Sequence, residues 1–111
     1  MLKLITALTL AIAGLQANSC YILVKRYKTL PVNEREAFVA GAHDALKAQI
    51  ESMNNPKTAR FLDCLKQGSS MDWTKAVDTF VSQHRSFQRH AVSDFCAVDI
   101  FEQVAFERCV R

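Results

Sequence analysis

Four cysteines constrain the fold of this 111-residue chain more than any other feature of its sequence. They are Cys20, Cys64, Cys96 and Cys109. An even number of cysteines in a small exported domain is typical of a disulfide framework. Zinc sites favour closely spaced pairs, and neither such pairs nor a Cys-x-x-Cys redox motif occur in this sequence. The sequence therefore predicts two disulfides, and it leaves all three possible pairings open.

The N-terminal segment gives the reason to expect an oxidising compartment. Residues 1–17 carry one positive charge near the start, followed by an apolar run of about a dozen residues. This order is typical of a secretory signal peptide, and the run is shorter than the roughly 20 residues of a membrane-spanning helix. We expect cleavage after residue 17, export to the periplasm and a single helical domain over 18–111. A lipoprotein anchor at Cys20 is the weaker alternative, because Asn18 fits poorly ahead of a lipidated cysteine.

Composition excludes several classes of protein. Half of the residues are apolar, 23% are charged and the formal net charge is only +3. This charge is too low for a protein that binds nucleic acid mainly by neutralising phosphates, and the apolar fraction is too high for a disordered chain. With three glycines and two prolines, the chain is neither collagen-like nor of low complexity. A single small folded domain remains.

Helical periodicity predicts most of the secondary structure. Residues 20–30 favour a short helix that Pro31 ends, although part of this segment is also typical of a strand. A long helix follows over 34–53, with Asn33 as its N-cap and Glu36 completing a capping box.

Three further helices are expected along the rest of the chain. Their predicted ranges are 55–66, 69–84 and 90–109. Asn55 and Pro56 are typical of the first helix start, and Ser69 with Asp72 forms a capping box for the second. No Asn-Gly or Asp-Gly hairpin signal occurs after the signal peptide. The predicted fold is therefore all-α, a compact bundle of four to five helices tied by two disulfides.

Gly41 lies in the middle of the long predicted helix, where glycine costs up to about 1 kcal/mol relative to alanine. Ala45 follows one helical turn later. The expected compensation is close packing of another helix against Gly41 and Ala45.

The sequence contains no constellation typical of catalysis. The histidines His43, His84 and His90 form no His-x-x-x-His or His-Glu-x-x-His pattern, and no nucleophile elbow or phosphate-binding loop is present. His43 and Asp44 are adjacent, so they point in different directions on a helix and make a poor acid–base pair. We expect no enzymatic activity, no metal site and no cofactor.

A basic segment between two predicted helices is the one surface feature with a distinct composition. The candidate partner-binding residues in it are His84, Arg85, Phe87, Gln88 and Arg89. Arginine and aromatic residues are enriched in protein interfaces. The alternative is an ordinary solvated turn between helices.

The order of helices and cysteines resembles a known family. The first long helix carries an aromatic residue, glycine, a small residue and aspartate in the segment Phe38-Val39-Ala40-Gly41-Ala42-His43-Asp44-Ala45-Leu46. Cys64, a helix from Trp73 to Val81, a turn around His84, the run Arg89-His90-Ala91 and Cys109 follow. Over roughly residues 34 to 109 this arrangement resembles the periplasmic amidase-immunity proteins of type VI secretion, the Tai-type family. It departs from that family at Arg85 and Arg108, where proline is usual.

The resemblance implies a small exported helical protein that binds a secreted peptidoglycan hydrolase and occludes its active site. It also makes a homodimer plausible. The family bridge would be Cys64–Cys109, and Cys96 has no family counterpart. Cys20 and Cys96 would then be left to pair with each other.

Three other functions stay open at this point. A periplasmic acid-stress chaperone of the Hde type is also small, exported, helical and disulfide-bonded. Against it, 11 acidic residues are unremarkable for a chain that must respond to acid. The further alternatives are a small structural protein of the envelope and, with the least support, a heme or metal carrier.

Overall fold

The computed structural model describes residues 20–110, so the predicted signal peptide at 1–17 lies outside the described residues. The helices are α2 (Val24–Tyr27), α3 (Val32–Met53), α4 (Ala59–Leu65), α5 (Ser70–Gln83) and α6 (Ala97–Cys109), with two 3₁₀ turns, η1 (Pro56–Thr58) and η2 (Val92–Asp94). The strands β1 (Ser86–Phe87) and β2 (His90–Ala91) form one short hairpin. The predicted all-α bundle tied by two disulfides is confirmed.

The long helix α3 begins two residues earlier than predicted. Pro31 is its N-cap, with φ −58° and ψ 155°, and no side chain caps the helix. Asn33 already lies inside the first turn, so the predicted capping box of Asn33 and Glu36 is wrong. Proline can take this position because its fixed φ suits a helix start and its missing N–H needs no partner there.

The caps of the next helices are confirmed. The Asn55 side chain accepts a hydrogen bond from the Lys57 backbone N–H at 3.0 Å, directly before η1. At the start of α5, the Ser69 hydroxyl accepts from the Asp72 N–H at 3.2 Å, and the Asp72 carboxylate accepts from the Ser69 N–H at 2.9 Å. This reciprocal pair is the predicted capping box.

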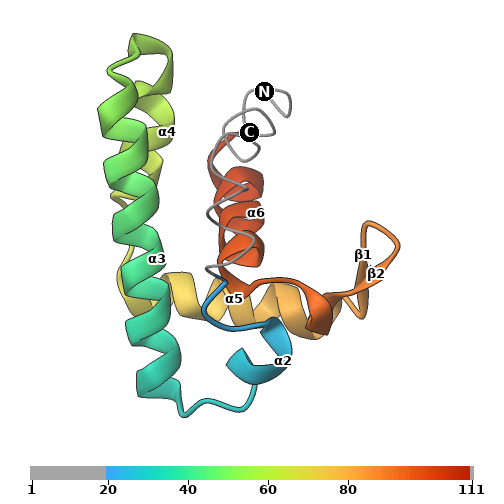
Figure 1. Ribbon diagram of the computed structural model, residues 1–111. Helices are drawn as coiled ribbons and strands as arrows, with labels where there is room; N and C mark the ends of the chain where they lie inside the picture. The colour runs from blue at the N-terminus through green and yellow to red at the C-terminus, as the bar shows by residue number, and fades with distance from the viewer. Residues whose placement is uncertain (1–19, 111) are drawn as a thin grey trace.

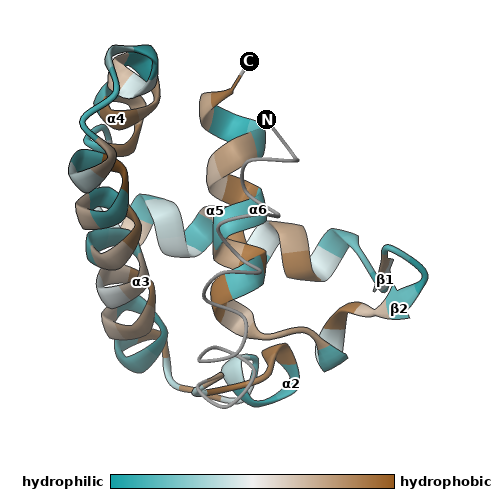
Figure 2. Ribbon diagram, turned by 45° about the horizontal axis from the view of Figure 1, so that its top comes forward, coloured by the Kyte–Doolittle hydropathy of each residue, from teal (hydrophilic) through white to brown (hydrophobic). Residues whose placement is uncertain are grey.

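Helix α5 crosses the molecule, and α3 and α6 both pack against it (Figure 1). The short α4 turns back beside α3 and also contacts α6. Brown, apolar residues lie along the sides of the helices that face one another (Figure 2). Trp73 is at the centre of this core with 1% of its surface exposed, and its indole N–H donates to the Gln67 carbonyl at 3.0 Å. No helix within residues 20–110 is long and apolar enough to cross a membrane.

Two disulfides tie distant parts of the chain together. Cys64 on α4 is bonded to Cys109 at the end of α6, and Cys20 is bonded to Cys96 just before α6. This is the pairing that the family resemblance implies. Two disulfides are typical of an oxidising compartment outside the cytosol.

The final helix is shorter than predicted, because the segment before it is extended. Ala97 rather than residue 90 is its first residue, and Cys96 is its N-cap. The Val24 N–H donates to the Phe95 carbonyl at 2.8 Å, and the Ala97 N–H donates to the Ile22 carbonyl at 3.0 Å. These bonds to residues 22–24 hold Phe95 and Cys96 in an extended conformation, which prevents the helix from starting earlier.

The expectation that another helix packs closely against Gly41 and Ala45 is wrong within the described part of this chain. Both residues are exposed on α3, and a Cβ added to Gly41 would meet nothing within 4 Å among the described residues. The buried face of α3 is instead marked by Val39 and Leu46.

Candidate partner-binding surface

The basic segment after α5 forms a hairpin rather than the plain turn that the sequence indicated. Ser86 pairs with Ala91 and Phe87 pairs with His90, in antiparallel register. The two residues of the turn between them both have positive φ values, 50° at Gln88 and 69° at Arg89. A two-residue turn of this kind suits the twist of the strands, and it normally uses asparagine and glycine. Here two long side chains occupy it, at a conformational cost.

Aromatic packing fixes the hairpin to the bundle. The Phe87 ring lies 5.6 Å from that of Phe80 on α5 and 5.5 Å from that of Phe95, both edge-on. His84 stacks on Phe80 at 4.0 Å and its ring Nδ1 lies 2.8 Å from the Phe80 carbonyl oxygen. The hairpin is therefore attached through its base while its tip projects from the body of the protein (Figure 1).

The five predicted partner-binding residues divide into two groups. His84 and Phe87 are half-buried in the aromatic packing just described, so they support the hairpin. Arg85, Gln88 and Arg89 are exposed. We use the name hairpin surface for these three exposed residues.

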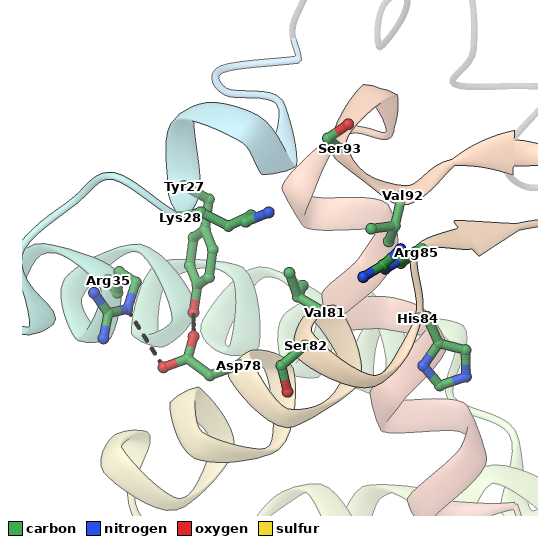
Figure 3. A pocket seen from close by; sticks show the side chains of 10 residues that line it. All are labelled: Tyr27, Lys28, Arg35, Asp78, Val81, Ser82, His84, Arg85, Val92 and Ser93. Carbon is green, nitrogen blue, oxygen red and sulfur yellow. Dashed lines mark hydrogen bonds and ion pairs between the residues drawn. The ribbon is translucent and has the colours of Figure 1, made fainter.

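A groove of about 610 Å³ lies beside the base of the hairpin. Its walls come from α2, the start of α3, the end of α5 and η2 (Figure 3). The lining residues are Tyr27, Lys28, Arg35, Asp78, Val81, Ser82, His84, Arg85, Val92 and Ser93. Val81 and Val92 are buried, so they form an apolar floor beneath polar and charged walls.

One wall of the groove is built around a carboxylate. The Tyr27 hydroxyl donates to Asp78 Oδ1 at 2.8 Å, and Arg35 Nε lies 3.4 Å from Asp78 Oδ2. Burial raises the pKa of the Tyr27 phenol, and its hydrogen bond to Asp78 raises that pKa further, so it stays a donor. Arg35 Nη1 also donates to the Leu30 carbonyl. The negative charge of Asp78 is therefore compensated by Tyr27 and Arg35.

Two other cations at this groove have no acidic partner within residues 20–110. Lys28 and Arg85 form none of the ion pairs found there. Figure 3 shows their side chains extending toward each other across the groove. Asp78 is the one acidic residue in the lining, and Arg35 faces it. The groove therefore carries more positive than negative charge.

His43 lies apart from the groove and is engaged in contacts within the bundle. His43 Nε2 makes a hydrogen bond with the Leu65 carbonyl, while Nδ1 lies 3.9 Å from the exposed carboxylate of Asp44. The His43 ring also packs against Trp73 and Phe101. Among residues 20–110, no three His, Cys, Asp or Glu side chains are grouped so that they could hold a metal ion.

The sequence singled out Arg85, Gln88 and Arg89 as candidate partner-binding residues, which stays a prediction, but it did not indicate the groove. Tyr27 and Asp78 are 51 residues apart, and Lys28 belongs to a segment whose secondary structure was ambiguous. A charged residue that faces a partner from another helix has no local sequence signal. The sequence signal that could have indicated the groove is that Lys28 and Arg85 each lie close to the end of a predicted helix.

Comparisons with known proteins do not add a relative to this description. No family model, no curated protein and no solved structure matches the chain. The Tai-type resemblance therefore stays a prediction.

Proposed function

We propose that this protein is a periplasmic binding protein that neutralises a secreted peptidoglycan amidase by covering its active-site cleft. The contact is made by the hairpin surface of Arg85, Gln88 and Arg89. The name of the target class comes from the Tai-type resemblance, whereas the proposal of a protein-binding surface rests on the hairpin.

The left-handed turn at Gln88 and Arg89 is the observation that carries the proposal. Both residues are exposed, so burial of their own side chains does not offset their conformational cost. Strained backbone that persists on a surface is found disproportionately at functional sites. A rigid hairpin that presents two arginines is well suited to entering a cleft, because little freedom is lost on binding.

The two disulfides support the same proposal. An inhibitor of a hydrolase must keep its shape in the presence of degradative enzymes. Each bridge closes a long loop, which removes conformations from the unfolded chain and lowers its population.

An acid-activated chaperone is less well supported by the charges of the fold. Such a protein loses packing when its carboxylates are protonated. Here burial raises the pKa of Asp99, and burial together with the Asp99 charge raises the pKa of Glu102 to about 7. Protonation of these two groups therefore favours the native state. Circular dichroism and dye binding at pH 2–3 would support the chaperone only if native packing is lost there.

Inhibition of a purified hydrolase tests the proposal directly. The candidates are secreted peptidoglycan amidases encoded beside the gene, assayed on isolated cell walls with equimolar protein. We expect inhibition, and we expect the double variant Arg85→Ala, Arg89→Ala to weaken binding at least 10-fold. Lys57→Ala is the matched control, since Lys57 is an exposed cation on η1, away from the hairpin. The proposal is wrong if these amidases are neither bound nor inhibited.

A further inference from the structure

We infer that the groove beside the hairpin binds a carboxylate side chain presented by an acidic segment of a protein partner, held between Lys28 and Arg85. The inference deepens the proposed function, because it names the chemistry that the partner brings to the site next to the hairpin surface. It rests on the groove itself, and it is tested without any hydrolase.

The first reason is the uncompensated charge. Lys28 on one wall and Arg85 on the opposite wall extend over the same hollow (Figure 3). Two cations that face each other repel, and neither has an acidic partner within the described residues. A carboxylate placed between them would replace this repulsion with two attractive contacts. Arg85 can bind such a group through two N–H donors at once.

The second reason is that Asp78 is already engaged elsewhere. Its two oxygens are engaged by the Tyr27 hydroxyl at 2.8 Å and by Arg35 at 3.4 Å. Tyr27 is 1% exposed, so the core fixes the hydroxyl that orients Asp78 away from Lys28 and Arg85. The carboxylate of Asp78 therefore does not neutralise the positive charges of Lys28 and Arg85.

The third reason concerns the size and polarity of the groove. A volume of about 610 Å³ accommodates a few side chains and lies within the usual range of ligand pockets. The buried Val81 and Val92 offer an apolar floor to the methylene groups of glutamate or to a neighbouring apolar residue. The Ser82 and Ser93 hydroxyls provide further donors at the rim. This mixture fits a protein segment better than a bare phosphate, for which an apolar floor has no use.

Nuclear magnetic resonance titration of the oxidised protein with two capped peptides tests the inference. One hexapeptide alternates Glu and Leu, and the matched peptide has Gln in place of Glu. We expect the acidic peptide to shift the backbone amide signals of residues 28, 85 and 93 and to saturate, with a Kd at least 10-fold below that of the Gln peptide. The preference should weaken at high salt, because exposed charges are screened.

Single variants identify the residues responsible. Lys28→Gln and Arg85→Gln should each raise the Kd of the acidic peptide about 5-fold, whereas Lys57→Gln should leave it unchanged. The spectrum of each variant shows whether the fold is intact. Inorganic phosphate and vesicles containing an anionic phospholipid are tested in parallel to separate other sources of negative charge.

Several results would overturn the inference. They are the absence of saturable shifts at millimolar peptide, equal binding of the Glu and Gln peptides, unchanged affinity in both groove variants, and binding of phosphate or vesicles that matches the acidic peptide. Inhibition of an amidase that is weakened by Arg89→Ala but insensitive to Lys28→Gln would also overturn it while leaving the proposed function intact. Selective peptide binding without amidase inhibition would support the groove and refute the proposed function.

Discussion

Replacing the hairpin turn Gln88-Arg89 by Asn-Gly should stabilise the protein. Both native residues are held at positive φ, 50° and 69°, a region that is sterically unfavourable for side chains with a Cβ. Asparagine visits this region more readily than other residues, and glycine does so without steric cost. The paired strands on either side remain as they are, so the substitution changes the turn and not its attachment.

The expected gain follows from the cost of each residue. A left-handed conformation costs about 1–2 kcal/mol in a residue with a Cβ. Glycine at position 89 removes this cost but loses about 0.5–1 kcal/mol through the greater freedom of its unfolded state. Asparagine at position 88 removes only part of the cost. Together the two changes should raise the free energy of unfolding by about 1 kcal/mol, which corresponds to a Tm increase of roughly 4–8 °C for a domain of this size.

Thermal and guanidinium denaturation of the oxidised protein, followed by circular dichroism, measures this difference. Asn54 provides an internal comparison, since it ends α3 with φ 47° and is already a residue that tolerates this region. Asn54→Gln should therefore destabilise the protein by about 0.5–1 kcal/mol. The reasoning is refuted if the Asn-Gly variant is no more stable than the native protein while Asn54→Gln behaves as expected.

Three further changes have calculable effects on stability. Gly41→Ala should raise the free energy of unfolding by about 0.5–1 kcal/mol in urea denaturation, because Gly41 is exposed in mid-helix and an added Cβ would meet nothing within 4 Å in residues 20–110. An unchanged free energy of unfolding would contradict this. The double variant Cys64→Ser, Cys109→Ser opens a bridge with a sequence separation of 45, so chain entropy predicts that the free energy of unfolding falls by about 4 kcal/mol. A fall of less than about 1 kcal/mol would refute the entropic argument. Burial raises the pKa of Glu102 to about 7, from 4.5 for an unperturbed glutamate. The stability that its bound proton contributes is therefore complete below pH 4.5 and is lost as the pH rises through about 7. Glu102→Gln should therefore be about 1–3 kcal/mol more stable than the native protein at pH 8 and similar to it near pH 4, and equal stability at both pH values would be the contrary result.

The helices of the core were predictable because their signals are local. The range of α5 follows from the Ser69–Asp72 box and from apolar residues at helical spacing, and both depend only on neighbours in sequence. The error at the start of α3 has a local cause as well. Asn33 and Glu36 satisfy the pattern of a capping box, but Pro31 provides an equally good start earlier in the chain.

The hairpin and the start of α6 were not predictable because distant contacts decide them. The run from Val92 to Phe95 has apolar residues that suit a helix, yet backbone bonds to residues 22 and 24 hold its end extended. The hairpin lacks the Asn-Gly or Asp-Gly signal on which sequence rules depend. Packing of Phe87 against Phe80 and Phe95 stabilises it instead. Local propensity is overridden in both places by tertiary structure.

The same distant contacts assemble the groove, and they give the two disulfides different roles. Cys64–Cys109 joins α4 to α6, neither of which lines the groove, so this bridge stabilises the bundle as a whole. Cys20–Cys96 lies where residues 22–24 pair with residues 95–97, immediately before α2 and after η2. Since α2 carries Lys28 at its C-cap and η2 borders the hairpin that follows Arg85, this bridge fixes the two walls relative to each other. Residues 20–27 are thus held in place by a covalent bond, by backbone pairing and by the buried side chains of Val24 and Tyr27. These restraints hold the backbone of Lys28 close to η2 and to the hairpin that follows Arg85, so the proposed carboxylate site would have both of its cations on a fixed frame.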